Sequence, residues 1–273
     1  MSAFVHLQKV VPQHLVSRLV GRLVASEGWV RGPLIRAFAR AYGVDMAEAE
    51  RSDLAAYRSF NDFFTRSLHP DARPVDPAPG AVVSPADGVV SQTGLVERGK
   101  LIQAKGIRYS FRTLADVCAG PEFEGGPFAT VYLSPSDYHR VHLPLAGRLV
   151  RTVAIPGKLF SVNAATEAGV EGLFAVNERL VMEFETGQGR MLMVMVGAMI
   201  VASIETVWDG PRSPYAERVV TEHDLPFEKG AEVGRFLLGS SVVMAFERGR
   251  VRLDPRLAPG VAVRMGRSIG VGA

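Results

Sequence analysis

Residues 179–208, RLVMEFETGQGRMLMVMVGAMIVASIETVW, say the most about the architecture of this chain. They contain runs of β-branched and other apolar residues punctuated by glycine, which is typical of short strands joined by turns. The longest apolar run, residues 191–204, has 14 residues, which is too few to cross a bilayer as a helix. We therefore expect a buried strand or a pair of strands here, with Gly197 as a kink and the methionines as core filler.

Similar short runs occur on both sides of this segment. They are AVVSPADGVVSQTG (81–94), FATVYLSP (128–135), GRLVRTVAIPG (147–157) and RVRLD (250–254). Runs of this length, separated by glycine and proline, predict a mostly antiparallel β domain. The sequence has no Walker A loop, and no glycine-rich dinucleotide fingerprint follows a strand.

The first third of the chain predicts helices. Apolar residues recur with helical spacing over 15–24 and again over 34–42. A third helix is expected in SFNDFFTRSL (59–68), where Ser59 can cap the first turn. The segment HPDARPVDPAPG (69–80) cannot be a helix interior, so it marks a linker or a wrapping segment.

Together these patterns predict an α+β protein with two parts. Residues 1–68 would form N-terminal amphipathic helices that associate with a membrane. Residues 69–273 would form a mostly antiparallel, β-rich catalytic domain.

The charge of the chain is concentrated near its N-terminus. The 273 residues carry a formal net charge of only +3, but residues 1–43 hold six basic residues and one acidic residue. Basic amphipathic helices can lie in a membrane interface, with Trp29 as an anchor and anionic lipid attracting the basic side chains. Alternatively, they pack on their own domain. The 28 acidic residues argue against a nucleic-acid-binding protein.

The cysteine and histidine content argues against disulfides and metal sites. A single cysteine, Cys118, excludes an intramolecular disulfide framework and any CxxC zinc or redox motif. His139 and His142 lie three residues apart, but no third ligand motif accompanies them. We therefore expect no metal.

Three short segments could carry chemistry. SPADG places Asp87 on a tight turn, SDYHRVHLP holds His139 and His142, and GSS places Ser240 after Gly239. Together Asp, His and Ser suggest a nucleophile whose proton is taken by an imidazole that the carboxylate orients. Structural roles remain open for each: aspartate before glycine is common turn chemistry, and small residues can mark a strand bulge. The flanks of Ser240 do not form the GxSxG elbow of a serine hydrolase.

The order of several motifs provides a more specific signal. They are SFNDFFTR (59–66), SPADG (84–88), DYHRVHLP (137–144), PGKLFSVN (156–163), NER (177–179) and LGSS (238–241). In this order they closely resemble phosphatidylserine decarboxylase, a family of self-processing pyruvoyl enzymes of phospholipid synthesis. The resemblance extends from Ser59 to about Phe246. Many members have LGST, so Ser241 replaces a threonine here and keeps its hydroxyl.

The resemblance implies that the chain breaks between Gly239 and Ser240. The hydroxyl of Ser240 attacks the preceding carbonyl and converts the amide to an ester. Elimination then leaves dehydroalanine, which hydrolyses to a pyruvoyl group and ammonia. A glycine before the serine suits this step, because it has no β-carbon and tolerates strained backbone angles. The products would be chains 1–239 and 240–273.

The resemblance also implies roles for the other residues. Asp87 and His142 would form the activating pair for Ser240. The pyruvoyl ketone would be the only cofactor, with no metal and no pyridoxal phosphate, and would accept the electrons released when carbon dioxide leaves phosphatidylserine. His139 would return a proton to give phosphatidylethanolamine, and the usual pKa range of histidine suits this task near neutral pH. Arg179 could contact the substrate or form a structural ion pair.

A lipid substrate implies peripheral attachment to the cytoplasmic side of the cell membrane through the N-terminal helices. The two processed chains would form a heterodimer, which could also assemble as a homo-oligomer. Three alternatives remain: a pyruvoyl decarboxylase of a soluble amino acid, a Ser-His-Asp lipid hydrolase that does not cleave itself, and a membrane-bound carrier without enzymatic activity. The first would remain active without residues 1–43, the second would keep Ser240, and the third would stay unbroken and form no carbonyl.

Overall fold

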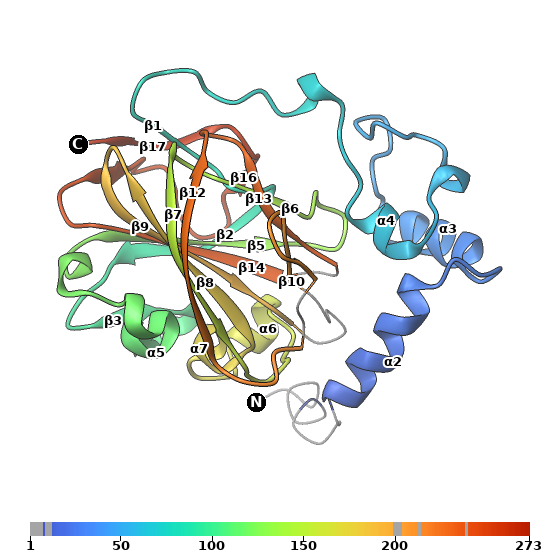
Figure 1. Cartoon of the computed structure of the whole chain (residues 1–273), viewed down its shortest axis with the longest axis horizontal. Coiled ribbons are helices and arrows are strands. Elements are labelled where there is room, and N and C mark those ends of the chain that lie inside the picture. The colour runs from blue at the N-terminus through green and yellow to red at the C-terminus, as the bar shows by residue number, and fades with distance from the viewer. Residues whose placement is uncertain (1–7, 9–12, 199–203, 212–213, 238–239) are drawn as a thin grey trace.

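The computed structural model describes residues 8, 13–198, 204–211, 214–237 and 240–273. A β-rich body forms most of the molecule, and helices from the N-terminal part lie at one side of it (Figure 1). The α+β class predicted from the sequence is therefore confirmed.

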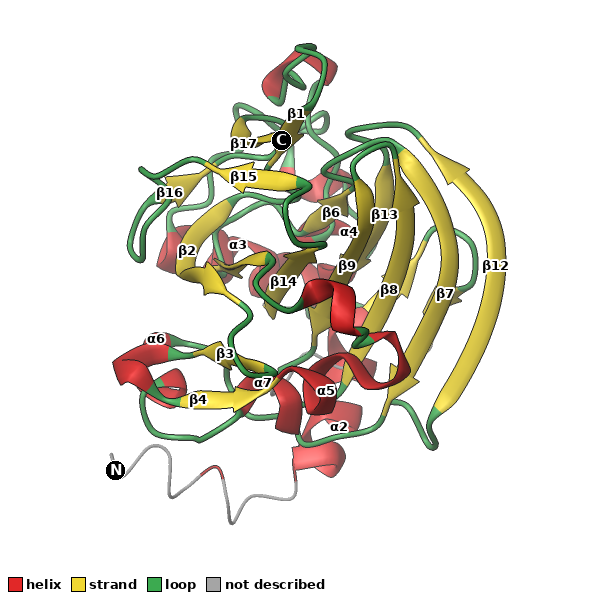
Figure 2. Ribbon diagram, turned by 90° about the vertical axis from the view of Figure 1, so that its left-hand side faces the viewer, coloured by secondary structure: helices red, strands yellow, loops and turns green. Residues whose placement is uncertain are grey.

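An eight-stranded antiparallel sheet forms the centre of the β-rich body (Figure 2). Its strands, in spatial order, are β12 (Val219–Phe227), β7 (Gly147–Ile155), β8 (Arg179–Thr186), β9 (Gly189–Val196), β14 (Ser240–Phe246), β5 (Pro127–Leu133), β2 (Gly88–Leu95) and β16 (Ala262–Val263). The hairpin β8–β9 lies in the middle of this sheet. Strand β14, which begins at Ser240, pairs with β9 on one side and β5 on the other.

Both faces of the central strands are buried. Val194 and Val243 belong to the apolar cluster on one face, and Met193 and Met244 belong to the cluster on the other. Because successive side chains along a strand point to opposite faces, a strand covered on both sides has a continuous apolar sequence. Each fully buried side chain of this size contributes about 1.5–3 kcal/mol. Met191, Met193 and Met195 are therefore core residues, as predicted, and Met199 lies outside the described residues.

The buried strand predicted for residues 191–204 is confirmed by β9, which ends at Val196, directly before Gly197. Residues 199–203 lie outside the described residues, and β10 begins at Ile204. This second strand belongs to a different sheet.

Smaller sheets flank the main one. In the described part of the chain they comprise β1 (Ala81–Val83), β17 (Ser268–Gly272) and β15 (Val251–Leu253); β11 (Gly210–Pro211), β10 (Ile204–Thr206), β13 (Glu232–Phe236) and β6 (Arg140–His142); and the pair β3 (Lys100–Ile102) and β4 (Arg108–Ser110). The second of these sheets is important for the site, because β6 carries the histidine motif.

Short helices cover part of the β-rich body. They are α5 (Phe111–Ala115), α6 (Ala164–Glu167) and α7 (Leu173–Val176), together with the 3₁₀ turns η3 (Ala104–Gly106), η4 (Asp116–Cys118) and η5 (Pro121–Phe123). Leu114 of α5 and Phe174 of α7 are buried in the same cluster as Val243. In Figure 2, α5 and α7 lie close to the β3–β4 pair.

The N-terminal helices have an apolar core of their own. They are α2 (Gln13–Ala25), α3 (Arg31–Tyr42), η1 (Leu54–Ala56) and α4 (Phe60–Phe64). The ring of Phe38 meets those of Phe60 and Phe63 edge to face. The predicted cap at Ser59 is confirmed, because its hydroxyl accepts a hydrogen bond from the Asp62 backbone N–H at 3.1 Å. No helix in the described ranges is both long and apolar enough to span a membrane.

The proline-rich segment 69–80 wraps over the β-rich body, as predicted. Apart from the turn η2 (Pro70–Ala72), it is irregular, and it runs from α4 to β1 (Figure 1). The Asp76 N–H donates to the Gly266 carbonyl at 2.9 Å. This contact joins the segment to the C-terminal part of the chain.

Candidate active site

The predicted cleavage position lies at the start of a central strand. The backbone of Ser240 pairs with Leu133 of β5, and Ser241 lies between Tyr132 and Val196. The hydroxyl of Ser241 is buried and has no hydrogen-bond partner among the described residues. Gly239 lies outside the described residues.

Backbone hydrogen bonds bring the predicted motifs together. Strand β5 ends opposite Ser240, and the chain then continues through residues 134–139 into β6. The His142 N–H donates to the carbonyl of Pro85, in the SPADG turn, at 2.8 Å. The carbonyl of His139 accepts from the N–H of Phe236, four residues before Ser240, at 3.0 Å. The fold thus gathers SPADG, the histidine motif and the start of β14.

The His142 imidazole is held at both ring nitrogens. Nδ1 lies 2.8 Å from the carbonyl oxygen of Gly230, and Nε2 lies 3.1 Å from the hydroxyl of Tyr138. Because a carbonyl can only accept, Nδ1 carries the proton, and Nε2 accepts from Tyr138. Burial lowers the pKa of His142. The neutral ring therefore presents a basic Nε2, as a proton acceptor requires.

Asp87 is buried and bound chiefly by an arginine. The Arg73 Nε lies 2.9 Å from both carboxylate oxygens, and the Met265 N–H donates to Oδ1 at 2.9 Å. No hydrogen bond joins Asp87 to His142 among the described residues. The charge of Asp87 nevertheless acts on His142, where it is a minor influence that raises the pKa. In this geometry the Gly230 carbonyl orients the imidazole, and Asp87 contributes through its charge.

His139 is more deeply buried than His142. Its ring stacks on Phe64 with 3.9 Å between centroids, and neither ring nitrogen has a hydrogen-bond partner in the described part of the chain. Burial, followed by the positive charge of Arg66, lowers the pKa of His139 to about 3, against a smaller opposing effect of the backbone at Ser134 and Pro135. The expectation that this pKa suits proton donation near neutral pH is therefore wrong for the protein without substrate. The ring is neutral there.

Comparison with known proteins identifies the family of the chain. The family model described as phosphatidylserine decarboxylase matches residues 60–271, and a model described as PSD matches residues 3–43. The chain belongs to the phosphatidylserine decarboxylase family.

Curated relatives match over nearly the whole chain. A phosphatidylserine decarboxylase proenzyme of Azotobacter vinelandii is 51% identical over 273 residues, which cover 96% of each chain. Proteins of the same name from Pseudomonas fluorescens and Acinetobacter baumannii are 50% and 48% identical, and each alignment covers 98% of this chain and at least 95% of the relative.

Other motif residues of the family have structural roles here. Arg179 is buried and donates to the backbone carbonyls of Leu114, Asn177 and Thr113 at 2.6–2.9 Å. It holds α5 against β8, and among the described residues its guanidinium forms these hydrogen bonds and not the ion pair considered above. Asn163 caps α6 by accepting from the Thr166 N–H at 3.0 Å.

Sequence reasoning missed three groups that contact the predicted site residues. Arg73 lies in the proline-rich segment 69–80, where its only signal was a positive charge. Tyr138 lies inside the histidine motif, so its position beside His142 could have been suspected. The Gly230 carbonyl has no sequence signal, because every residue has a backbone carbonyl.

The surroundings fit the pyruvoyl group that the family implies. A reactive ketone needs a site that excludes water and offers polar groups not already engaged. His139 and Ser241 are buried and have polar atoms without hydrogen-bond partners in the described part of the chain. Among the described residues, no three metal-binding side chains are grouped.

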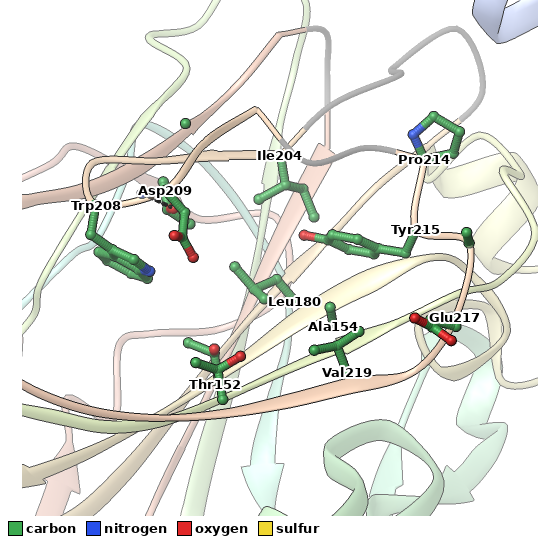
Figure 3. A pocket seen from close by; sticks show the side chains of 14 residues that line it. Thr152, Ala154, Leu180, Ile204, Trp208, Asp209, Pro214, Tyr215, Glu217 and Val219 are labelled. Carbon is green, nitrogen blue, oxygen red and sulfur yellow. Dashed lines mark hydrogen bonds between the residues drawn. The ribbon is translucent and has the colours of Figure 1, made fainter.

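A separate cavity of about 280 Å³ lies beside the main sheet. Leu180, Ile204 and Tyr215 point toward one another across it (Figure 3). Leu180 is on β8, and β9 separates that strand from β14. None of the predicted site residues lines this cavity.

Proposed function

We propose that this chain is the proenzyme of a decarboxylase that converts phosphatidylserine to phosphatidylethanolamine and carbon dioxide. The observation that carries the proposal is the meeting of His139, His142 and the SPADG turn at the start of β14. This is the place where the family relationship predicts the reactive group.

Self-processing begins with the Ser240 hydroxyl. His142 accepts its proton at Nε2 after Tyr138 yields that position, while Gly230 keeps the ring in the required tautomer. Asp87 favours the resulting imidazolium through its negative charge. The oxygen of Ser240 bonds to the Gly239 carbonyl carbon, and the C–N bond breaks as the imidazolium returns its proton to the Ser240 nitrogen, which leaves an ester. Elimination and hydrolysis then release ammonia and the two chains.

The small chain remains in place after cleavage. It contains β14, which pairs with β9 and β5, and also β15, β16 and β17. These strands keep their hydrogen bonds and their buried side chains when one peptide bond is cut. We therefore propose a tightly associated pair of chains, 1–239 and 240–273.

The pyruvoyl group supplies a carbonyl that forms a covalent link with the substrate amine and accepts electrons as carbon dioxide leaves. The protein provides the setting for this step. Burial of the site keeps bulk water away, and His139 holds a proton for return to the same carbon. To donate this proton, the neutral ring must first take one up when the substrate is bound.

The N-terminal helices provide a surface for peripheral attachment at the cytoplasmic face of the membrane. Trp29 is 87% exposed, and Leu23 and Tyr42 are about half exposed. Arg36 and Arg40 of α3 are exposed as well. Exposed apolar anchors beside basic side chains suit the interface of an anionic bilayer. We propose that residues 1–68 make this contact.

The two proposed parts are not independent. The Leu159 N–H donates to Gln13 Oε1 at 2.8 Å, and the Phe64 ring stacks on His139. Residues 1–68 therefore face the membrane and also supply contacts to the catalytic part, residues 69–273.

Two variants test the proposal. Ser240→Ala should leave a single chain that releases no carbon dioxide from phosphatidylserine vesicles, because the attacking hydroxyl is absent. His139→Ala should still cleave but should lose decarboxylation by about 100-fold or more, as expected for a lost general acid.

Activity of an uncleaved wild-type chain on these vesicles would contradict the proposal. Labelling of an intact Ser240 by a serine-directed phosphonate, with lipid hydrolysis in place of decarboxylation, would instead identify the hydrolase alternative.

A further inference from the structure

Arg66 is a buried arginine with unused hydrogen-bond donors. Only 4% of the residue is exposed. Its Nη2 donates to the carbonyl of Ser136 at 3.1 Å, but Nε and Nη1 have no hydrogen-bond partner among the described residues. The charges of Asp87 and Asp137 act on the guanidinium at a distance, and neither carboxylate hydrogen-bonds it. Its charge therefore lacks a direct counter-ion.

His139 lies in the same small region as Arg66. Phe64, two residues before Arg66, stacks on the His139 ring, and Ser136, which accepts from Arg66, is three residues before His139. The intervening Thr65 carbonyl accepts from Arg140 Nε at 2.9 Å. These contacts fix the end of α4 against the histidine motif. Two neighbouring buried side chains thus both have polar atoms without partners.

Such a pair is energetically unusual. A buried guanidinium without full hydrogen bonding has lost water contacts without replacing them. Most buried polar groups in folded proteins have partners, and exceptions often mark a site for a ligand or a reaction. An anion is the natural ligand, because a guanidinium can donate two parallel hydrogen bonds to phosphate or carboxylate oxygens.

We propose that Arg66 binds the phosphodiester of the lipid headgroup and so places the reacting carbon of the substrate beside His139. This inference rests on the proposed decarboxylase function. The inference adds to that function the residue that recognises the negative charge of the lipid.

The phosphodiester is a better ligand for Arg66 than the substrate carboxylate. A guanidinium on the carboxylate would stabilise the charge that must be lost when carbon dioxide leaves, and would therefore oppose the reaction. The phosphodiester keeps its charge throughout. Three covalent bonds separate its phosphorus from the carbon that loses the carboxyl group, so a cation that holds the phosphate also fixes that carbon nearby.

Binding of this anion would also change His139. The positive charge of Arg66 is one cause of the low pKa of His139. A bound phosphodiester offsets that charge, so the imidazole takes up a proton more readily once the substrate is present. The substrate would thus help to prepare its own proton donor.

Product inhibition provides the test, because phosphatidylethanolamine has the phosphodiester but lacks the carboxylate. The measurement uses processed wild-type enzyme, Arg66→Lys and Arg66→Gln with phosphatidylserine in mixed micelles. We expect both variants to cleave themselves. The KM for phosphatidylserine and the inhibition constant of phosphatidylethanolamine should rise together in Arg66→Gln, by roughly 10- to 100-fold, and by less in Arg66→Lys.

Arg51→Gln is the matched control. Arg51 belongs to the same N-terminal part, but its guanidinium is already paired with Asp62 at 2.6 Å. Both constants should remain near the wild-type values in this variant.

The wild-type enzyme allows a second measurement that needs no variant of Arg66. A phosphotriester of phosphatidylethanolamine, methylated at the phosphate so that the phosphate carries no negative charge, should inhibit it roughly 10- to 100-fold less strongly than phosphatidylethanolamine itself. Equal inhibition by the two lipids would overturn the proposal.

Other outcomes with the Arg66 variants would also overturn it. An unchanged phosphatidylethanolamine inhibition constant beside a raised KM would assign Arg66 to the carboxylate. Folded variants that fail to cleave would assign it to self-processing. An inactive, uncleaved wild-type enzyme would instead refute the decarboxylase function itself.

Discussion

His139 combines complete burial with an aromatic neighbour and ring nitrogens that have no partners in the described part of the chain. Its low pKa, about 3, has burial as the main cause. The folded protein therefore keeps this ring neutral over a wide pH range. An unfolded chain does not, because its histidine takes up a proton near pH 6.5. Because of this difference in pKa between the folded and unfolded chain, His139 lowers the stability of the fold in acid.

Stability should depend on pH through His139 in a defined direction. Titration of His139 leaves the free energy of unfolding unchanged above about pH 6.5. As the pH falls from there toward 3, this free energy decreases by up to about 1.4 kcal/mol per pH unit, because the unfolded chain binds a proton that the folded chain does not. Urea unfolding of Ser240→Ala, with and without His139→Phe, at pH 7 and pH 4.5 measures this effect. Phenylalanine keeps the stack on Phe64 and removes the titrating group.

The free energy of unfolding should fall less between these pH values in the double variant. His142 is present in both proteins, so its contribution cancels in the comparison. A difference between the two proteins that stays constant from pH 7 to pH 4.5 would show that burial does not keep His139 neutral.

At the residue scale, the sequence predicted which groups meet but not how they are held. His142 and the SPADG turn were expected to meet, and a backbone hydrogen bond joins them. The partners Arg73 and Gly230 could not be predicted, since one lies 14 residues from Asp87 and the other acts through its carbonyl. The pKa of His139 depends on burial, which an isolated motif does not reveal.

Among the elements, β2 and β5 show how closely the SPADG turn packs against the sheet. Gly88 follows Asp87 and begins β2, with a φ of +154°. A β-carbon at this position would overlap the backbone carbonyl oxygen of Tyr132 on β5. Glycine is therefore required for the close approach that fixes the position of Asp87.

Gly88→Ala should destabilise the protein by about 2 kcal/mol or more and slow self-cleavage, because backbone atoms of β5 must move. Gly187→Ala is the matched control, since a β-carbon there meets nothing within 4 Å. Thermal unfolding and the fraction of cleaved chain on denaturing gels measure the two effects. Equal behaviour of the two variants would show that the close contact is unimportant.

Element types were more predictable than their arrangement. The cap at Ser59, the wrapping proline-rich segment and the buried methionine-rich strand follow from local patterns, and all are present. The insertion of β14 between β9 and β5 does not follow from such patterns. It depends on contacts between segments that are distant in the sequence.

At the scale of the whole molecule, the helical part exposes large apolar side chains to solvent. Trp29 is far more exposed than a tryptophan usually is. Because the proposed substrate lies in a bilayer, the same side chains can bring the active site to the lipid. The structure places α4 of this part beside the histidine motif through the Phe64–His139 stack.

Trp29→Ala should weaken binding to anionic vesicles by roughly 10-fold, because an exposed indole loses its place in the interface. Leu95→Ala, which removes another half-exposed side chain on β2, should leave binding unchanged. Co-sedimentation with vesicles measures both, and higher salt should weaken wild-type binding. Equal losses in the two variants would argue against attachment through the helices.

Intact-mass spectrometry of the purified, active protein tests the proposed self-processing most directly. We predict two chains, residues 1–239 and 240–273, with the smaller one lighter than its encoded sequence by one ammonia because Ser240 has become a pyruvoyl group. A single unmodified chain of 273 residues in catalytically competent material would contradict this prediction.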